Sequence, residues 1–235
     1  DKFEQRTRMV VGNNVETNYT YDPRNRRLAT LNSAAPNDPA LQQLAYTYDA
    51  VGNITQLANN APVPPSNTFG GPTGQTFNYD DLYRLVSAQG FHQAAHERND
   101  YTLYMQYDAT HNITHKNQHH WVTRNGGKPL DQRATTYDWA YRYKTLGQTQ
   151  PHAPSHIGNR AFTYDANGNQ TGWTHDLNGT RRTLVWDEEN RIREVQDPRH
   201  ATRYVYDDQG ERNIKWGQYG ETAYINQFFT VRNGA

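Results

Sequence analysis

The sequence predicts an all-β protein built from antiparallel β-hairpins stacked edge to edge, and three observations support this prediction. One short phrase recurs along the 235 residues: two aromatic or apolar residues two positions apart, then an aspartate, then a turn residue three positions later. Sustained helical periodicity is absent. The 17 Tyr, 7 Phe and 5 Trp are spread along the chain, and aromatic residues are enriched in strands.

Each copy of the phrase indicates one hairpin. In the clearest copy, Tyr46 and Tyr48 alternate toward one face of a strand. Asp49 can accept hydrogen bonds from backbone N–H groups of the following turn, and Gly52 supplies the positive φ of a tight reversal. The alternating segment 54–57 then reads as the returning strand. Isolated hairpins are marginal in water, so the copies are expected to stack and protect one another.

The same positions recur in seven copies, and Tyr137–Asp138 is an eighth, degenerate candidate. We expect the aromatic residues before the turns to occupy equivalent positions and to stack in rows. Several copies replace the turn glycine, among them those with Asn25, Tyr83 and His111 at this position. The predicted structural motif residues are Tyr21, Asp22, Tyr48, Asp49, Gly52, Tyr79, Asp80, Tyr107, Asp108, Tyr164, Asp165, Gly168, Trp186, Asp187, Tyr206, Asp207 and Gly210.

The segments between the copies are rich in Pro, Asn and Gly. They predict loops over Asn32–Pro39, Asn59–Gly74 and Gln148–Gly158. The place where the pattern allows a short helical turn is Phe91–Arg98. These segments show no composition shift that would mark a domain boundary, so residues 1–235 are expected to form a single repeat region.

Both ends of the chain suggest hairpins that continue in a larger parent protein. Asn233–Gly234 is a strong hairpin-turn signal with no returning strand after it. At the other end, strand-like segments flank Gly12–Asn14. We therefore expect the chain to be a fragment truncated at both ends.

The composition argues against several classes of protein. Lys+Arg and Asp+Glu number 24 each, so the whole chain has no net field to attract nucleic acid. The mean hydropathy is −1.08 and no apolar run approaches the roughly 20 residues of a membrane span. The first 25 residues lack a signal-peptide pattern, and the chain has no cysteine.

The copies resemble those of YD-repeat proteins, the group containing bacterial Rhs proteins, the B and C components of insecticidal toxin complexes, and animal teneurins. The stretches 41–55 and 79–85 look especially like toxin-complex B components. This resemblance implies a strip of hairpins that spirals into a hollow shell around a C-terminal toxin. It also implies a secreted or exported protein whose partners are the rest of its own chain, the enclosed toxin and other toxin-complex or secretion-machinery subunits.

The residue composition also allows functions other than a structural one. A carbohydrate-binding or adhesion surface is the main alternative, because Tyr, Trp, Asn and Asp are the residues that sugar recognition uses. The neighbouring carboxylates 187–189 read as a solvated turn and not as a glycosidase pair, so no enzyme activity and no catalytic residue is predicted. The histidines at 111, 115, 119 and 120 lie around a hairpin, where alternate side chains diverge, and we expect no metal or cofactor.

Overall fold

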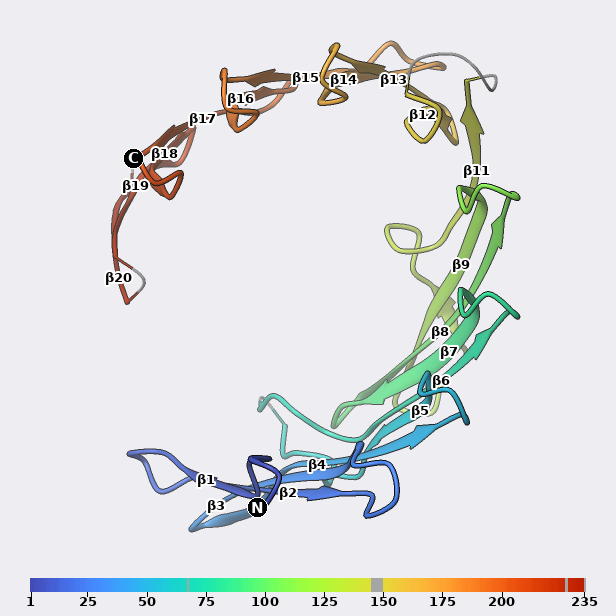
Figure 1. Ribbon diagram of the computed structural model, residues 1–235, viewed down its shortest axis with the longest axis vertical. Helices are drawn as coiled ribbons and strands as arrows, with labels where there is room; N and C mark the ends of the chain where they lie inside the picture. Colours follow the sequence, from blue (N-terminus) through green and yellow to red (C-terminus); the bar gives the residue numbers. More distant parts are fainter. Residues whose placement is uncertain (67, 145–149, 227, 235) are drawn as a thin grey trace. The chain divides into compact units, whose positions relative to one another are not determined.

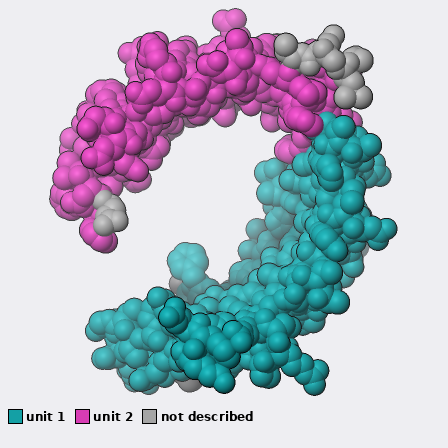
Figure 2. Space-filling model, viewed as in Figure 1, with its two compact units in different colours: residues 1–138 teal, residues 139–235 magenta. Residues whose placement is uncertain are grey.

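The computed structural model describes residues 1–66, 68–144, 150–226 and 228–234. The chain divides into two compact units, residues 1–138 and residues 139–235 (Figure 2). Every regular element in the described ranges is a β-strand (Figure 1), which confirms the all-β prediction. No helix in this part of the chain could therefore cross a membrane. A single repeat region over 1–235 remains a prediction, and each unit carries copies of the motif.

The first unit is a single antiparallel sheet in which each strand pairs with the next one along the chain. After β9 the chain returns, and β10 pairs with β9. The strands are β1 (Arg8–Val10), β2 (Glu16–Tyr21), β3 (Leu28–Ala35), β4 (Asp38–Tyr48), β5 (Ile54–Asn59), β6 (Thr73–Tyr79), β7 (Leu85–Gln93), β8 (Glu97–Tyr107), β9 (Ile113–Arg124) and β10 (Leu130–Asp131).

The second unit repeats this arrangement, with consecutive strands paired antiparallel from β11 to β20. Its first strand begins at the boundary between the units. The strands are β11 (Tyr137–Tyr143), β12 (Pro154–Ile157), β13 (Arg160–Tyr164), β14 (Gln170–His175), β15 (Arg181–Trp186), β16 (Ile192–Gln196), β17 (Ala201–Tyr206), β18 (Arg212–Gly217), β19 (Gly220–Asn226) and β20 (Phe229–Gly234).

Neither unit has a thick hydrophobic core. Among the described residues the buried apolar side chains are Ala61, Ala88 and Val122, and Thr17 is the one buried polar residue. Its hydroxyl is hydrogen-bonded to that of Ser33 at 2.9 Å. Most strand residues are half-buried instead, as expected for a single layer whose two faces are both partly wet.

In the following three segments the expectation about local structure is wrong, because strand pairing overrides residue composition. The predicted loop Asn32–Pro39 lies largely in β3 and β4, which pair up to a two-residue turn. Phe91–Arg98 is a β-hairpin and not a helical turn, since the amide of Ala94 donates to the carbonyl of Glu97 at 2.8 Å. Asn233–Gly234 is not a turn, because both residues pair with β19 inside β20.

The other two predicted loops have different outcomes. Between β5 and β6 the described residues 60–66 and 68–72 form no strand or helix, which confirms the expected loop except at its ends, where Asn59 belongs to β5 and Gly74 to β6. In the segment Gln148–Gly158, residues 148 and 149 lie outside the described residues. The expectation of a loop is wrong for Pro154–Ile157, which forms β12 between β11 and β13.

The turns after the aspartates have the left-handed backbone that the sequence predicts. Gly52, Gly168 and Gly210 have φ of 113°, 90° and 84°. Tyr83 and His111 adopt φ of 62° and 68° at the same position, even though they carry a Cβ. The expectation for Asn25 is shifted by one residue: the positive φ of 61° falls on Arg26, because this turn is one residue longer.

Replacement of Gly52 by alanine is expected to destabilise the protein by about 1 to 3 kcal/mol, because a φ of 113° is strained for any residue with a side chain. The new Cβ would also lie 2.6 Å from Nη2 of Arg27. Gly12→Ala is the matched control, because Gly12 has no positive φ and no atom near its Cβ position. Thermal or urea unfolding measures both variants, and equal losses of stability would contradict this account.

Candidate functional site: the turn ladder

The turn that follows each motif aromatic is organised by the carboxylate of its aspartate. In the turn at Asp108, Oδ1 accepts hydrogen bonds from the amides of Thr110 at 2.8 Å and Asn112 at 2.9 Å. In five further turns Oδ1 of the aspartate likewise accepts two hydrogen bonds, one from the amide two or three residues later and one from the amide four residues later. These turns begin at Asp49, Asp80, Asp165, Asp187 and Asp207. One side chain therefore satisfies two amides of the reversal.

In five of these six turns the second carboxylate oxygen binds the side chain of the residue four positions on, and this residue divides the five turns into two kinds. The sixth turn, at Asp207, has Glu211 at that position. Asn53, Asn112 and Asn169 donate through their amide nitrogens to Oδ2 of their aspartates at 2.7 to 3.0 Å. Arg84 and Arg191 donate through Nε at 2.7 and 2.8 Å. Both kinds of turn have a donor bound to Oδ2 of the aspartate, but the arginine side chains have additional N–H donors.

The aromatic residue before each aspartate binds the preceding hairpin. The hydroxyl of Tyr107 donates to the carbonyl oxygen of Leu85 at 2.8 Å. Leu85 is the first residue of the preceding return strand and pairs with the earlier motif residue Tyr79. The same contact joins Tyr48 to Leu28, Tyr79 to Ile54, Tyr164 to Pro154 and Tyr206 to Ile192, and Tyr21 reaches Arg6, all at 2.8 to 3.0 Å.

Trp186 fills this position with a different donor. Its indole Nε1–H donates to the carbonyl oxygen of Gln170 at 2.8 Å, and Gln170 is the residue that pairs with Tyr164. Tryptophan therefore replaces tyrosine here without loss of the contact. The seven motif aromatics occupy equivalent positions, yet no two of their rings stack among the described residues. Hydrogen bonds to the backbone join the rows instead of the expected ring stacking.

Arg84 and Arg191 also contact the next turn along the chain. Nη1 of Arg84 donates to the carbonyl oxygen of Asp108 at 3.2 Å, and the guanidinium lies 4.6 Å from the ring centroid of Tyr107. Arg191 makes the same pair of contacts with Asp207 and Tyr206, at 3.4 and 4.9 Å. One side chain thus links its own aspartate to the backbone and the aromatic ring of the next turn.

Arg27 plays this part in the longer first turn. The turn at Asp22 has six residues between the paired residues Tyr21 and Leu28, whereas the turn between Tyr48 and Ile54, like those of the other copies, has five. The extra residue moves the arginine to the fifth position after the aspartate. Its Nη1 still donates to the carbonyl oxygen of Asp49 at 2.9 Å, and its guanidinium lies 5.5 Å from the ring of Tyr48.

We call this set of contacts the turn ladder: the motif aspartates, the aromatic residue before each one, and the linking residues Arg27, Arg84 and Arg191. In the second unit Gln150 makes the corresponding contact with the turn at Asp165, since its Nε2 donates to the carbonyl oxygen of Asp165 at 2.5 Å. The linking role was missed in the sequence analysis. A signal was present, because Arg84 and Arg191 occupy the position where turns with glycine have asparagine or glutamate.

The predicted eighth copy does not form a turn. Asp138 lies inside strand β11, and its carboxylate is paired with the imidazole of His115. His119 is likewise paired with Asp131 at 2.9 Å, and His120 contacts Asn99 at 3.1 Å. These histidines of β9 hold the returning segment around β10, so the Tyr-Asp dipeptide alone does not specify a turn.

The hydrogen bonds of the turns lower the pKa of the aspartates. At Asp108 burial acts in the opposite direction, but hydrogen bonds from Thr110 and Asn112 bring its pKa down to about 2. At Asp80 the amide of Arg84 is the largest cause of the lowered pKa. Burial raises the pKa of the ladder tyrosines Tyr48, Tyr79, Tyr107, Tyr164 and Tyr206. These shifts favour the ionised aspartate, which accepts the hydrogen bonds of the turn, and the neutral tyrosine, which donates its hydroxyl hydrogen to a carbonyl oxygen.

Substitution Tyr107→Phe is expected to cost about 1 kcal/mol of stability, because it removes the hydrogen bond to Leu85 and leaves the ring in place. Tyr104→Phe in the same strand is the control, since Tyr104 is 58% exposed and its hydroxyl has no partner in the described structure. The control should change stability by less than about 0.5 kcal/mol. Urea unfolding measures the free energy of unfolding of both variants, and equal losses of stability would argue against the ladder.

Stability is expected to fall as the pH is lowered from about 4 to about 2, because the folded-state pKa of Asp108 lies below its ordinary value of 3.8. A group with a lowered folded-state pKa stabilises the fold above its ordinary pKa, and this contribution is lost on protonation. Asp108→Asn should flatten the dependence, whereas Asp81→Asn, at an exposed turn position, should leave it steep. Unfolding measured from pH 6 to pH 2 tests this, and parallel curves for wild type and Asp108→Asn would refute it.

Comparisons with known proteins agree with this repeat architecture. The profile of the teneurin YD-shell family matches residues 13–212. Toxin subunit YenC2 of Yersinia entomophaga is 37% identical over 100 residues, which cover 37% of this chain and 10% of YenC2. Toxin subunit YenC1 of the same organism is 36% identical over 93 residues, covering 34% and 9%. The matched part thus spans about a tenth of these relatives.

Solved structures share the fold. A chain in the crystal structure of TcdB2-TccC3-Cdc42 superposes with a TM-score of 0.56 at 19% identity, covering 97% of this chain and 12% of that one. A chain of the Photorhabdus luminescens Tc holotoxin pore gives 0.52 at 20% identity, covering 97% and 13%. The repeated hairpins and the family match over residues 13–212 lead to one conclusion: the chain belongs to the teneurin YD-shell family of YD-repeat proteins.

Proposed function

We propose that this chain is a wall segment of a toxin-complex shell that encloses a toxin polypeptide, and that it carries out no chemistry of its own. The observation that supports this most is the single-layer sheet of each unit, whose successive hairpins are tied by the turn ladder and not by a core. Such a layer separates two aqueous spaces with a wall that is only one sheet thick. The toxin subunits YenC1 and YenC2 are relatives of the chain, which fits this role.

The proposed partners follow from that role. They are the remainder of the parent chain, the enclosed toxin and other subunits of the toxin complex or its secretion machinery, and the complete protein is proposed to be secreted or exported. Nucleic acid and membrane lipid are not proposed as partners. The charges of the chain balance at 24 basic and 24 acidic residues.

The carboxylates at the turn of Asp187 support a structural role for that turn. Arg191 binds Asp187 at 2.8 Å and Glu189 at 2.9 Å from the same guanidinium. A glycosidase instead needs two carboxyl groups that face each other across a cleft, about 5 to 10 Å apart. The two acids are held together around one cation, so we propose that they stabilise the turn.

A carbohydrate-binding surface remains the alternative, and the contacts of the ladder favour the wall. Sugar recognition by aromatic residues needs an open ring face and free polar groups. The motif aromatics already donate to backbone carbonyls, and arginines lie over the rings of Tyr48, Tyr107 and Tyr206 at 4.6 to 5.5 Å.

The wall role is tested by limited proteolysis of the complete natural polypeptide that carries this chain. We expect a toxin segment to be protected in the wild type and to be digested faster in the double variant Arg84→Gln, Tyr107→Phe, because this variant loosens two adjacent hairpins. Tyr104→Phe is the control and should protect as well as wild type. Digestion of the toxin segment at one common rate in all three proteins would overturn the proposal.

A further inference from the structure

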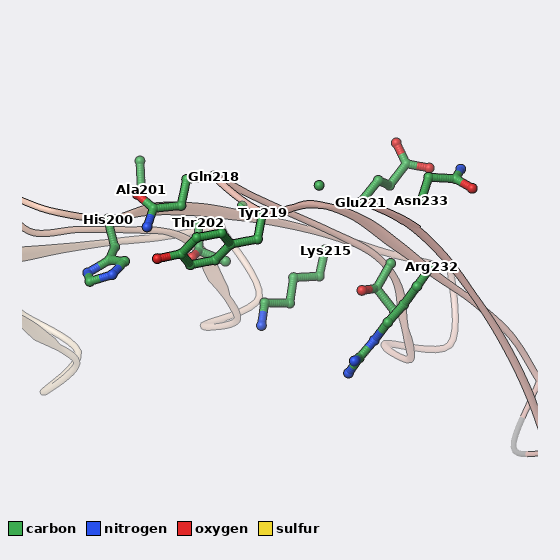
Figure 3. A pocket seen from close by; sticks show the side chains of 12 residues that line it. His200, Ala201, Thr202, Lys215, Gln218, Tyr219, Glu221, Arg232 and Asn233 are labelled. Atoms are coloured by element: carbon green, nitrogen blue, oxygen red, sulfur yellow. The ribbon is translucent and has the colours of Figure 1, made fainter. Parts of the chain in front are cut away.

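The second unit contains a hollow of about 430 Å³ that lies over strands β17 to β20. Figure 3 shows the side chains of His200, Lys215, Tyr219 and Arg232 projecting to one side of the sheet, with Glu221 on the other side. Two of the four carry a fixed positive charge. The side of the sheet that faces the hollow is therefore cationic.

The strand register explains why the two cations lie together. Lys215 pairs with Thr222, and Thr222 pairs with Arg232, so the three residues form one row across three neighbouring strands. Strands lie about 4.8 Å apart, which places the backbones of Lys215 and Arg232 roughly 10 Å apart. Their long side chains can close on one small group between them, with the Thr222 hydroxyl at the centre of the row.

The charges in this row are not neutralised by the protein. Neither Lys215 nor Arg232 has an ion pair within the described part of the chain. Glu221 is the one carboxylate among the lining residues, and the indole of Trp216 binds it at 2.5 Å on the opposite side. The nearby Asp197 is occupied by Arg182 at 2.8 Å and by His200 at 3.3 Å.

We propose that this hollow binds the carboxylate side chains of an acidic polypeptide segment. The inference rests on the proposed function, because the anionic groups that an enclosed polypeptide presents to the wall are the carboxylates of its Asp and Glu side chains. A guanidinium, an ammonium and a hydroxyl in one row supply donors for a carboxylate. Tyr219 is 78% exposed, and its ring lies 6.5 Å from that of His200, so the two rings form a rim against which neighbouring peptide atoms can pack.

Fluorescence anisotropy with a labelled glutamate-rich peptide tests this site in the full chain. The wild type should bind the peptide, with an affinity that falls between about 0.05 and about 0.5 M salt, and should not bind the glutamine counterpart. Lys215→Gln and Arg232→Gln should each weaken binding by on the order of tenfold. Equal melting temperatures of the variants and wild type show that folding is unaffected.

Arg181→Gln is the control of equal charge change. Arg181 and Thr183 point to one side of the sheet, and the pairings of Thr183 with Gln196 and of Gln196 with Ala201 place Ala201 on that side. Lys215 lies on the other side, because Thr202 pairs with Gly217, two residues from Lys215. The Arg181→Gln variant should therefore bind the peptide with wild-type affinity. Equal losses in all three variants, or wild-type affinity in Lys215→Gln and Arg232→Gln, would overturn the site.

Inorganic phosphate separates a peptide site from a site for any small anion. We expect phosphate to displace the peptide only at concentrations far above those of the peptide, and displacement at equal concentrations would overturn the assignment to polypeptide carboxylates. The proteolysis experiment reports independently. Intact protection with wild-type peptide affinity in the variants would refute this inference alone, whereas loss of protection in the wild type would refute the proposed function.

Discussion

The hydrogen bond from a motif aromatic to the backbone of the preceding hairpin is the contact on which the rest of the structure depends. A hairpin alone is marginal in water, and the described residues include only three buried apolar side chains, those of Ala61, Ala88 and Val122. The Tyr107 hydroxyl and the Trp186 indole N–H both end at a carbonyl oxygen of the previous return strand. Each ring therefore fixes the position of its own turn relative to the hairpin before it.

The aspartates make that contact reproducible because they fix the backbone directly after each ring. The carboxylate of Asp108 accepts hydrogen bonds from two amides and from the side chain of Asn112, and these bonds lower its pKa and keep it ionised. The linking arginines then carry the geometry from one turn to the next. In such a layer, directional polar contacts take over the part that close packing plays in a globular core.

This construction suits the proposed role of a wall. The contacts of the turns stabilise the layer, so neither face has to be buried. The side chains on the two faces can therefore differ in chemistry. In the second unit one side presents Lys215 and Arg232, whereas Glu221 lies on the other. The faces can therefore meet different partners while the turn ladder stays the same.

The sequence by itself determined the fold class and the turns, because these follow from contacts within a few residues. Asp49 binds amides up to four positions away, and Gly52 adopts its positive φ locally, so a nine-residue phrase is enough to predict them. Tertiary structure decided where strands replace the predicted loops. Asn233 pairs with Glu221, a partner twelve residues away that no turn propensity encodes.

Longer-range contacts were beyond the sequence for the same reason. The hydrogen bond from Arg84 to Asp108 joins residues that are 24 positions apart. Asp138 does not form the expected turn, because it lies in a strand and pairs with His115. The row of Lys215, Thr222 and Arg232 exists only once three strands are in register. Turn chemistry is local and can be read along the chain, whereas these groupings depend on which strands become neighbours and in what register they pair.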